Sequence, residues 1–154
     1  MEIETKRLLM RPFSMQDAAA LYPILGDRNV MRFIQEPFTM EQTKNFIERA
    51  GLSAPPLVYA LEYKENRHII GHVIFHPYDS TSYELGWILD SRVWGKGFAN
   101  EITQALIEEA RRRGIPSLVI ECHPGQKASC KIAIKNGFWD EGNHKGRQIY
   151  RISL

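Results

Sequence analysis

A carboxylate stands inside an otherwise apolar, strand-like segment of the chain, Tyr83 to Leu89 (YELGWIL). Strand alternation places Glu84 on one face of that segment together with Gly86 and Ile88. A charge in such a strand is out of pattern, and carboxylates with shifted acidity gather at functional sites. Glu84 is therefore a candidate general base, acting directly or through a water molecule. The alternative is that Glu84 forms a structural ion pair.

A glycine-containing turn follows this segment and leads at once into a long amphipathic stretch. The turn reads WGKGFA at residues 94–99. Glycine lets the backbone approach a ligand closely, and the first turn of a helix carries unpaired N–H groups and a partial positive charge. Such a join can hold a phosphate or pyrophosphate. The turn therefore predicts a nucleotide-bearing cofactor, with Lys96 and Arg92 as candidates to meet its phosphates unless they are ordinary solvated surface charges.

Few other residues offer chemistry. Cys122 and Cys130 are the two cysteines, and they form neither a disulfide framework nor a set of metal ligands. A reducing cytoplasm suits them. The histidines His72, His76 and His123 lack the spacing of metal ligands, so we expect no metal.

Composition limits the class of protein. The chain has 154 residues, of which 44% are hydrophobic and 25% charged, and its net charge is +2. We expect one domain, residues 1–154, and the balanced charge does not call for a nucleic-acid partner. No apolar run approaches the roughly 20 residues of a membrane span, and the charged N-terminus lacks the apolar core of a signal peptide. A cytoplasmic protein with no membrane partner is therefore expected.

The strands that must position these residues follow from apolar periodicity and turn signals. The segment Ser117 to Cys122 (SLVIEC) has the pattern of a short buried strand, and Lys145-Gly146 is typical of a hairpin turn. The expected strands are Lys6–Arg11, Leu57–Tyr63, His68–Phe75, Tyr83–Leu89, Ser117–Cys122, Phe138–Asp140 and Gln148–Leu154.

Four helices are expected between the strands. The first opens with Ser14 and Asp17 in a capping box, and the second has Thr39 as its N-cap, Gln42 at the reciprocal position and Gly51 as its end. The third and fourth span 98–113 and 127–135. This order of elements predicts a mixed α/β domain around a central sheet.

Four motifs occur in order along the chain: TKRLLMRP at 5–12, ELGW at 84–87, WGKGFA at 94–99, and Ala128-Ser129 followed by NGF at 136–138. Together they resemble the GNAT superfamily of acetyl-CoA-dependent N-acetyltransferases, and within it the branch of the ribosomal-protein N-terminal acetyltransferases. The third motif is the most specific. The resemblance implies an α/β fold with a mixed, mostly antiparallel sheet of about seven strands, about four flanking helices, and a V-shaped splay between the central strands.

The resemblance also implies where acetyl-CoA would bind. The cofactor would lie in the V-shaped opening, with its pantetheine arm paired to one strand and its pyrophosphate on the glycine turn. Gln126 stands where many relatives carry an Asn that touches the arm. The implied cofactor-binding residues are Ile88, Leu89, Trp94, Gly95, Lys96, Gly97, Phe98, Ala99, Asn100 and Gln126.

The implied reaction is transfer of an acetyl group to a primary amine, by direct attack in a ternary complex. Many relatives have a general-acid Tyr at the position of Ala133, so a tyrosine acid at that position is excluded. Ser129 is the candidate to protonate the leaving sulfur, or it is simply a helix-cap serine. A backbone N–H near Leu89 would meet the oxyanion.

Several alternatives stay open from the sequence. The acceptor is either a protein N-terminus or a small-molecule amine, and the protein is either a monomer or a homodimer. A non-catalytic acyl-CoA-binding or sensing domain would keep the glycine turn without turnover. A dinucleotide-binding enzyme fits less well, because the turn lacks the third glycine of that fingerprint.

Overall fold

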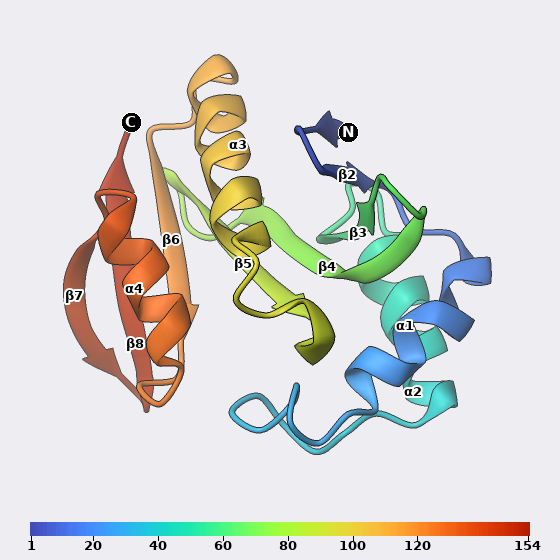
Figure 1. Cartoon of the computed structure of the whole chain (residues 1–154). Helices are drawn as coiled ribbons and strands as arrows, with labels where there is room; N and C mark the ends of the chain where they lie inside the picture. Colours follow the sequence, from blue (N-terminus) through green and yellow to red (C-terminus); the bar gives the residue numbers. More distant parts are fainter. The chain divides into compact units, whose positions relative to one another are not determined.

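Eight strands and four α-helices follow one another in the computed structural model, which describes residues 1–154 (Figure 1). The helices are α1 (Ala18–Leu25), α2 (Met40–Phe46), α3 (Phe98–Arg112) and α4 (Lys127–Lys135). The strands are β1 (Ile3–Glu4), β2 (Leu8–Arg11), β3 (Val58–Tyr63), β4 (His68–Pro77), β5 (Ser82–Leu89), β6 (Ser117–Cys122), β7 (Trp139–His144) and β8 (Arg147–Ser153).

The strand order of the sheet is β1-β2-β3-β4-β5-β6-β8-β7. Strands β5 and β6 are parallel, whereas β2 pairs with β3 and β6 with β8 in antiparallel fashion. The expected mixed, mostly antiparallel sheet with four helices is therefore confirmed. The additional strand is β1, which pairs Ile3 with Met10 of β2 and is only two residues long. Strand β7 also extends beyond the expected end at Asp140, to His144.

The chain forms two compact units, each made of two segments. The first unit contains Met1–Ile74 and Trp87–Phe98, and the second contains Phe75–Gly86 and Ala99–Leu154. Strands β4 and β5 and helix α3 therefore contribute residues to both units.

Both early helices in the first unit begin as the capping patterns predict. Asp17 Oδ2 accepts a hydrogen bond from the Ser14 amide at 2.8 Å, which opens the turn before α1. Thr39 Oγ1 accepts from the Gln42 amide at 3.1 Å, and Gln42 Oε1 accepts from the Thr39 amide at 2.8 Å. Helix α2 continues into a single π-turn that ends at Gly51.

The core of the first unit lies between these helices and strands β3 and β4. Its side chains come from α1, from the segment that follows it, from the π-turn and from the strands, so the hydrophobic effect joins local elements to distant ones. The buried members are Phe13, Ala18, Leu21, Ile24, Leu25, Val30, Met31, Ile47, Val58, Ala60 and Ile69.

Strand register in the second unit sets which side chains share a face. β5 pairs with β6 only through Ser82, Tyr83 and Glu84, which lie opposite 117–119. Glu84 therefore shares a face with its partner Val119, and Tyr83 lies on the other face.

Helices α3 and α4 of the second unit cover the Tyr83 face. The guanidinium of Arg113, directly after α3, lies 5.6 Å from the centre of the Tyr83 ring. Cys130 of α4 contacts Cys122 of β6 with a Sγ–Sγ distance of 3.4 Å, and Cys122 lies on the Tyr83 face by alternation from Leu118, the partner of Tyr83. Glu84 therefore points away from both helices.

Candidate active site

The turn between β5 and α3 presents unused backbone donors. Gly95 and Gly97 have φ angles of +77° and +82°, which suit glycine, and a Cβ at Gly95 would meet nothing within 4 Å. The amides of residues 95–97 donate no hydrogen bond to the backbone of the chain. The first amides of α3 follow directly, and helix geometry leaves them without helical acceptors. This arrangement fits a phosphate group.

Arg7, just before β2, fixes the shape of this turn. Its Nη1 donates to the carbonyl oxygen of Lys96 at 2.9 Å, and its guanidinium lies 4.3 Å from the centre of the Phe98 ring. A Cβ at Gly97 would lie in ordinary contact with Arg7 Nη2, at 3.4 Å, so it is the positive φ of Gly97 that favours glycine there. Sequence reasoning included Arg7 in a motif but gave it no role, because the contact spans 89 positions.

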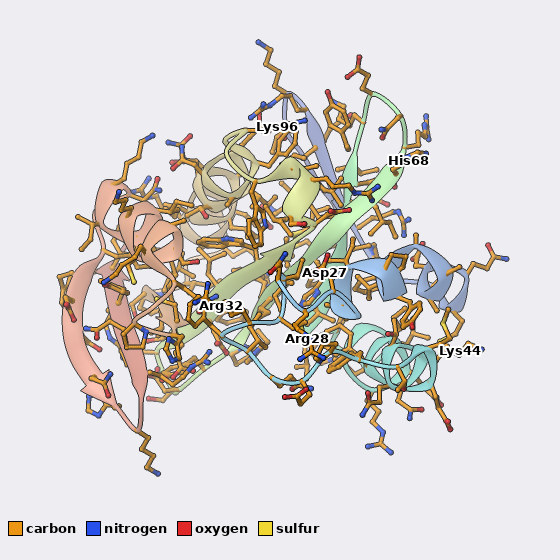
Figure 2. All side chains as sticks on the ribbon, turned by 60° about the horizontal axis from the view of Figure 1, so that its bottom comes forward. Asp27, Arg28, Arg32, Lys44, His68 and Lys96 are labelled. Carbon is orange, nitrogen blue, oxygen red and sulfur yellow. The ribbon has the colours of Figure 1, made fainter.

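The two cations proposed for the phosphates differ in their surroundings. Arg92 Nη2 lies 2.6 Å from Asp90 Oδ2, so its guanidinium already has an anionic partner. Lys96 is exposed on the turn itself (Figure 2) and forms no ion pair within the chain. Of the two, Lys96 is the cation free to meet an anionic ligand.

The end of β5 is held by its neighbours in the first unit. Trp94 Nε1 donates to the carbonyl oxygen of Leu89 at 2.9 Å, and the Asp90 amide donates to the carbonyl oxygen of Ile70 at 2.8 Å. The Trp94 ring is 52% exposed, so its indole closes the turn by this bond rather than by burial. Trp94 thus has a structural role in this turn.

Glu84 is paired with a histidine. Its Oε2 lies 3.1 Å from His76 Nε2, and the other ring nitrogen of His76, Nδ1, lies 2.8 Å from the carbonyl oxygen of Pro77. The hydrogen bond to Glu84 raises the pKa of His76 above its ordinary value, although burial opposes this shift. The ion pair considered as the alternative role of Glu84 therefore exists, and its partner is a residue to which the sequence gave no role.

Ser129 lies in the first turn of α4 and not at its cap. The helix begins at Lys127 and its N-cap is Gln126, so the interpretation of Ser129 as a helix-cap serine is wrong. Gln126 Oε1 accepts from the His123 amide at 2.7 Å, which orients the side chain and leaves its amide nitrogen for a ligand. The Ser129 side chain is half-buried.

Asn100 and Asn136 connect the two helices of the second unit. Asn136 Nδ2 donates to Asn100 Oδ1 at 2.8 Å and to the carbonyl oxygen of Ile132 at 2.8 Å. The first turn of α3 is thereby tied to the end of α4. This contact gives the NGF motif a role, which is to join the helix that starts at the glycine turn to the helix that carries Ser129.

Within the second unit, Glu84 and Ser129 lie on opposite sides of the sheet. Glu84 is on the face of Val119, whereas α4 packs on the face of Cys122. A reaction at this sheet would therefore have its base on one side and its acid on the other.

The two cysteines are free thiols. Cys122 is buried, and burial raises its pKa to about 12. A thiol that stays protonated at neutral pH is a poor nucleophile.

No group of three or more metal-ligating side chains is present in the chain, and none of its helices is both long and apolar enough to span a membrane.

Comparison with known proteins identifies the family. A family model described as the acetyltransferase (GNAT) domain matches residues 7–139. The chain belongs to the GNAT acetyltransferases. It is therefore an acyltransferase, and enzymes of this family take the acetyl group from acetyl-CoA.

Individual relatives support this family assignment. An uncharacterized N-acetyltransferase of Bacillus subtilis, YnaD, is 34% identical over 149 residues, which are 94% of this chain and 86% of YnaD. A GNAT-family acetyltransferase from Bacillus anthracis superposes with a TM-score of 0.89 at 26% identity and covers 99% of this chain and 98% of its own. RimL, a ribosomal L7/L12 α-N-protein acetyltransferase solved with coenzyme A, superposes with a TM-score of 0.85 at 20% identity, covering 100% and 98%. At that identity the likeness to RimL concerns the fold alone.

Proposed function

We propose that this GNAT protein transfers the acetyl group of acetyl-CoA to a primary amine by direct attack in a ternary complex, and that residues 1–154 act as one catalytic domain. The observation that carries the proposal is the turn at residues 94–100. It combines unused backbone donors, two glycines with positive φ and an exposed Lys96. A hydrogen bond from Arg7 to the carbonyl oxygen of Lys96 fixes its shape.

The cofactor would be bound mainly by backbone groups. The amides of 95–100 would hold the pyrophosphate of acetyl-CoA, with Lys96 adding charge. Backbone groups of Ile88 and Leu89 would pair with the pantetheine arm as a further strand would, beyond the point where the register of β5 with β6 ends at Glu84. Gln126 would add its side-chain nitrogen.

The chemistry would divide between the two faces of the sheet. When bound, acetyl-CoA supplies the thioester carbonyl. An amine reaches the site mostly protonated at neutral pH, so Glu84 would remove a proton before attack. A backbone N–H near Leu89 would donate to the oxyanion, and Ser129 would donate a proton to the departing sulfur. Because thiolate is a fair leaving group, Ser129 adds less to the rate than Glu84.

The acceptor is a protein N-terminus or a small-molecule amine. The resemblance of the sequence motifs to the ribosomal-protein N-terminal acetyltransferases favours a peptide N-terminus, and acceptor choice resides in loops. The loop between α1 and α2 carries Asp27, Arg28 and Arg32, which are labelled in Figure 2. Asp27 Oδ1 accepts from the Asn29 amide within the loop, whereas Arg28 is exposed and would be the charge that meets an acceptor. The protein would act as a monomer or a homodimer.

Calorimetric titration of the purified protein with acetyl-CoA tests the proposal, with NAD and ATP as control ligands. Selective micromolar binding of acetyl-CoA is expected, followed by turnover in a screen of amines and peptides with free N-termini. Absence of acetyl-CoA binding would overturn the proposal. Accumulation of acetylated enzyme without an amine would overturn direct attack.

A non-catalytic acyl-CoA-binding domain is the second candidate, favoured by the absence of a tyrosine at position 133. Glu84→Gln separates the two functions. An enzyme would lose turnover and keep its affinity for acetyl-CoA, whereas a binding domain would show no turnover before or after the substitution.

A further inference from the structure

We propose that His76 and Glu84 act as one proton-accepting pair, in which His76 positions the Glu84 carboxylate and stores the proton that the acceptor amine loses. This inference rests on the proposed function, because it assigns a partner to the base of that reaction. It adds a residue to the site that sequence patterns did not reveal.

The two contacts of His76 define its protonation. A carbonyl oxygen can only accept, so the 2.8 Å contact with Pro77 requires a hydrogen on Nδ1. The 3.1 Å contact between Nε2 and Glu84 Oε2 is favourable only if a proton also lies between these two atoms. The geometry is therefore that of an imidazolium donating to a carboxylate, with no net charge on the pair.

The form that has lost this shared proton is the one able to act as a base. In that form a neutral imidazole, still protonated at Nδ1, faces the carboxylate, and the pair has a net charge of −1. An ammonium acceptor then gives one proton to Glu84, and this proton comes to rest on His76 Nε2. The N–H bond breaks, its electron pair stays on the amine nitrogen for attack on the thioester carbonyl, and the pair returns to zero net charge.

The surroundings of the pair favour a cationic acceptor. Tyr78, in the turn after β4, and Glu121 of β6 lie near Glu84. Burial raises the pKa of Tyr78, and the charges of Glu121 and Glu84 raise it further. Glu121 shares the face of Glu84, because it lies two residues after Val119. Arg151 of β8 is the nearby cation, and it is already engaged by Asp79 and Glu141.

The same face of β5 carries a small residue next to the pair. Gly86 follows Glu84 on this side of β5 and has no side chain to cover it. The cation Arg113 lies on the opposite face, over Phe75 and Tyr83, where it does not face the pair. Glu84 is therefore the charged group in direct contact with His76, and it sets the acidity of the ring.

Nuclear magnetic resonance of the imidazole rings tests the pair without an acceptor. The protein has five histidines, and the spectrum of His76→Asn assigns the resonance of His76. The titration midpoint of His76 is expected above that of an ordinary histidine, and it should fall toward the ordinary value in Glu84→Gln. A midpoint that Glu84→Gln leaves unchanged would overturn the pair.

Kinetics tests the proton-storing role. In His76→Gln the amide nitrogen takes the place of Nε2 and still donates to Glu84, but it does not titrate. With an acceptor found in the amine screen, kcat/KM of the wild type should rise with pH through the midpoint of His76. The His76→Gln variant should lose this limb and about 100-fold in kcat at the optimum, with KM nearly unchanged. A wild-type pH profile in His76→Gln would overturn the role.

Failure of the proposed function would look different. If acetyl-CoA did not bind, or no amine were acetylated, the proposed function and the proton-storing role would both fall. A shift of the His76 midpoint in Glu84→Gln would then show a structural ion pair and nothing more.

Discussion

Gly71 of β4 and Ile88 of β5 approach so closely that a Cβ on Gly71 would stand 2.0 Å from the carbonyl oxygen of Ile88. Real Cβ atoms do not approach a backbone oxygen this closely, so any other residue at position 71 must move β5. The φ angle of Gly71, +154°, is also one that side-chain-bearing residues rarely adopt. Because Ile88 is a proposed partner of the pantetheine arm, this contact connects sheet geometry to cofactor binding.

We predict that Gly71→Ala lowers the free energy of unfolding by about 1–3 kcal/mol and weakens acetyl-CoA binding at least tenfold. Urea unfolding and calorimetric titration measure the two effects. Gly142→Ala is the matched control, since Gly142 also has a positive φ, +96°, but a Cβ there meets nothing within 4 Å. If Gly71→Ala bound acetyl-CoA as tightly as Gly142→Ala, the link between this contact and the cofactor would be wrong.

A second prediction concerns acid stability. His72 is buried, its Nδ1 has no hydrogen-bond partner, and burial lowers its pKa to about 4. In the unfolded chain this histidine therefore binds a proton near pH 6.5, whereas in the folded protein it binds one only near pH 4. Stability that is complete above pH 6.5 is lost as the pH falls toward 4, by about 2 kcal/mol between pH 7 and pH 5.

Substitution of His72 isolates this contribution. Asn places an amide near the position of Nδ1 and does not titrate, so His72→Asn should be less stable than wild type at pH 7 but lose less stability on acidification. Urea unfolding at pH 7, 6 and 5 gives the comparison. Parallel losses in both proteins would show that His72 is not the group responsible.

The sequence predicted local structure well and distant contacts poorly. Both capping boxes, β6 and α4 were predicted because their signals lie within a few residues, and the first turn of a helix depends on its own neighbours. β1 was missed because two residues carry no periodicity, and its strand character comes from pairing with β2.

The candidate active site was likewise predictable only in its local features. The glycine turn at 94–99 was recognisable because its function needs a local backbone shape. The contact of Arg7 with the turn and the partner of Glu84 were not, since both contacts join residues that only the folded chain brings together. His76 lies opposite Glu84 only when β4 and β5 are folded on each other, and nothing in the type of either residue shows that.

A third prediction tests the contact of Arg7 with the glycine turn. Arg7→Ala removes the bond to the Lys96 carbonyl and the contact with the Phe98 ring, so the amides that would face the pyrophosphate lose their fixed arrangement. We expect acetyl-CoA affinity to fall about tenfold, the effect of losing about 1.4 kcal/mol of preorganisation. Calorimetric titration measures it. Lys44→Ala, which removes an exposed charge from α2, is the control and should bind as wild type.

The final prediction concerns an ion-pair network in the first unit. Arg11 of β2 donates from Nε to Glu62 Oε2 at 2.7 Å and from Nη1 to Asp17 Oδ2 at 2.9 Å. Glu62 is buried, so removal of Arg11 leaves an uncompensated carboxylate in the sheet. Arg11→Met should therefore lower the free energy of unfolding by about 3–5 kcal/mol. The double variant Arg11→Met/Glu62→Gln replaces the unpaired carboxylate by a neutral amide and should recover part of this loss. Urea unfolding of the single and double variants provides the comparison. A double variant less stable than Arg11→Met would show that Glu62 is satisfied by other groups and that Arg11 acts through packing alone.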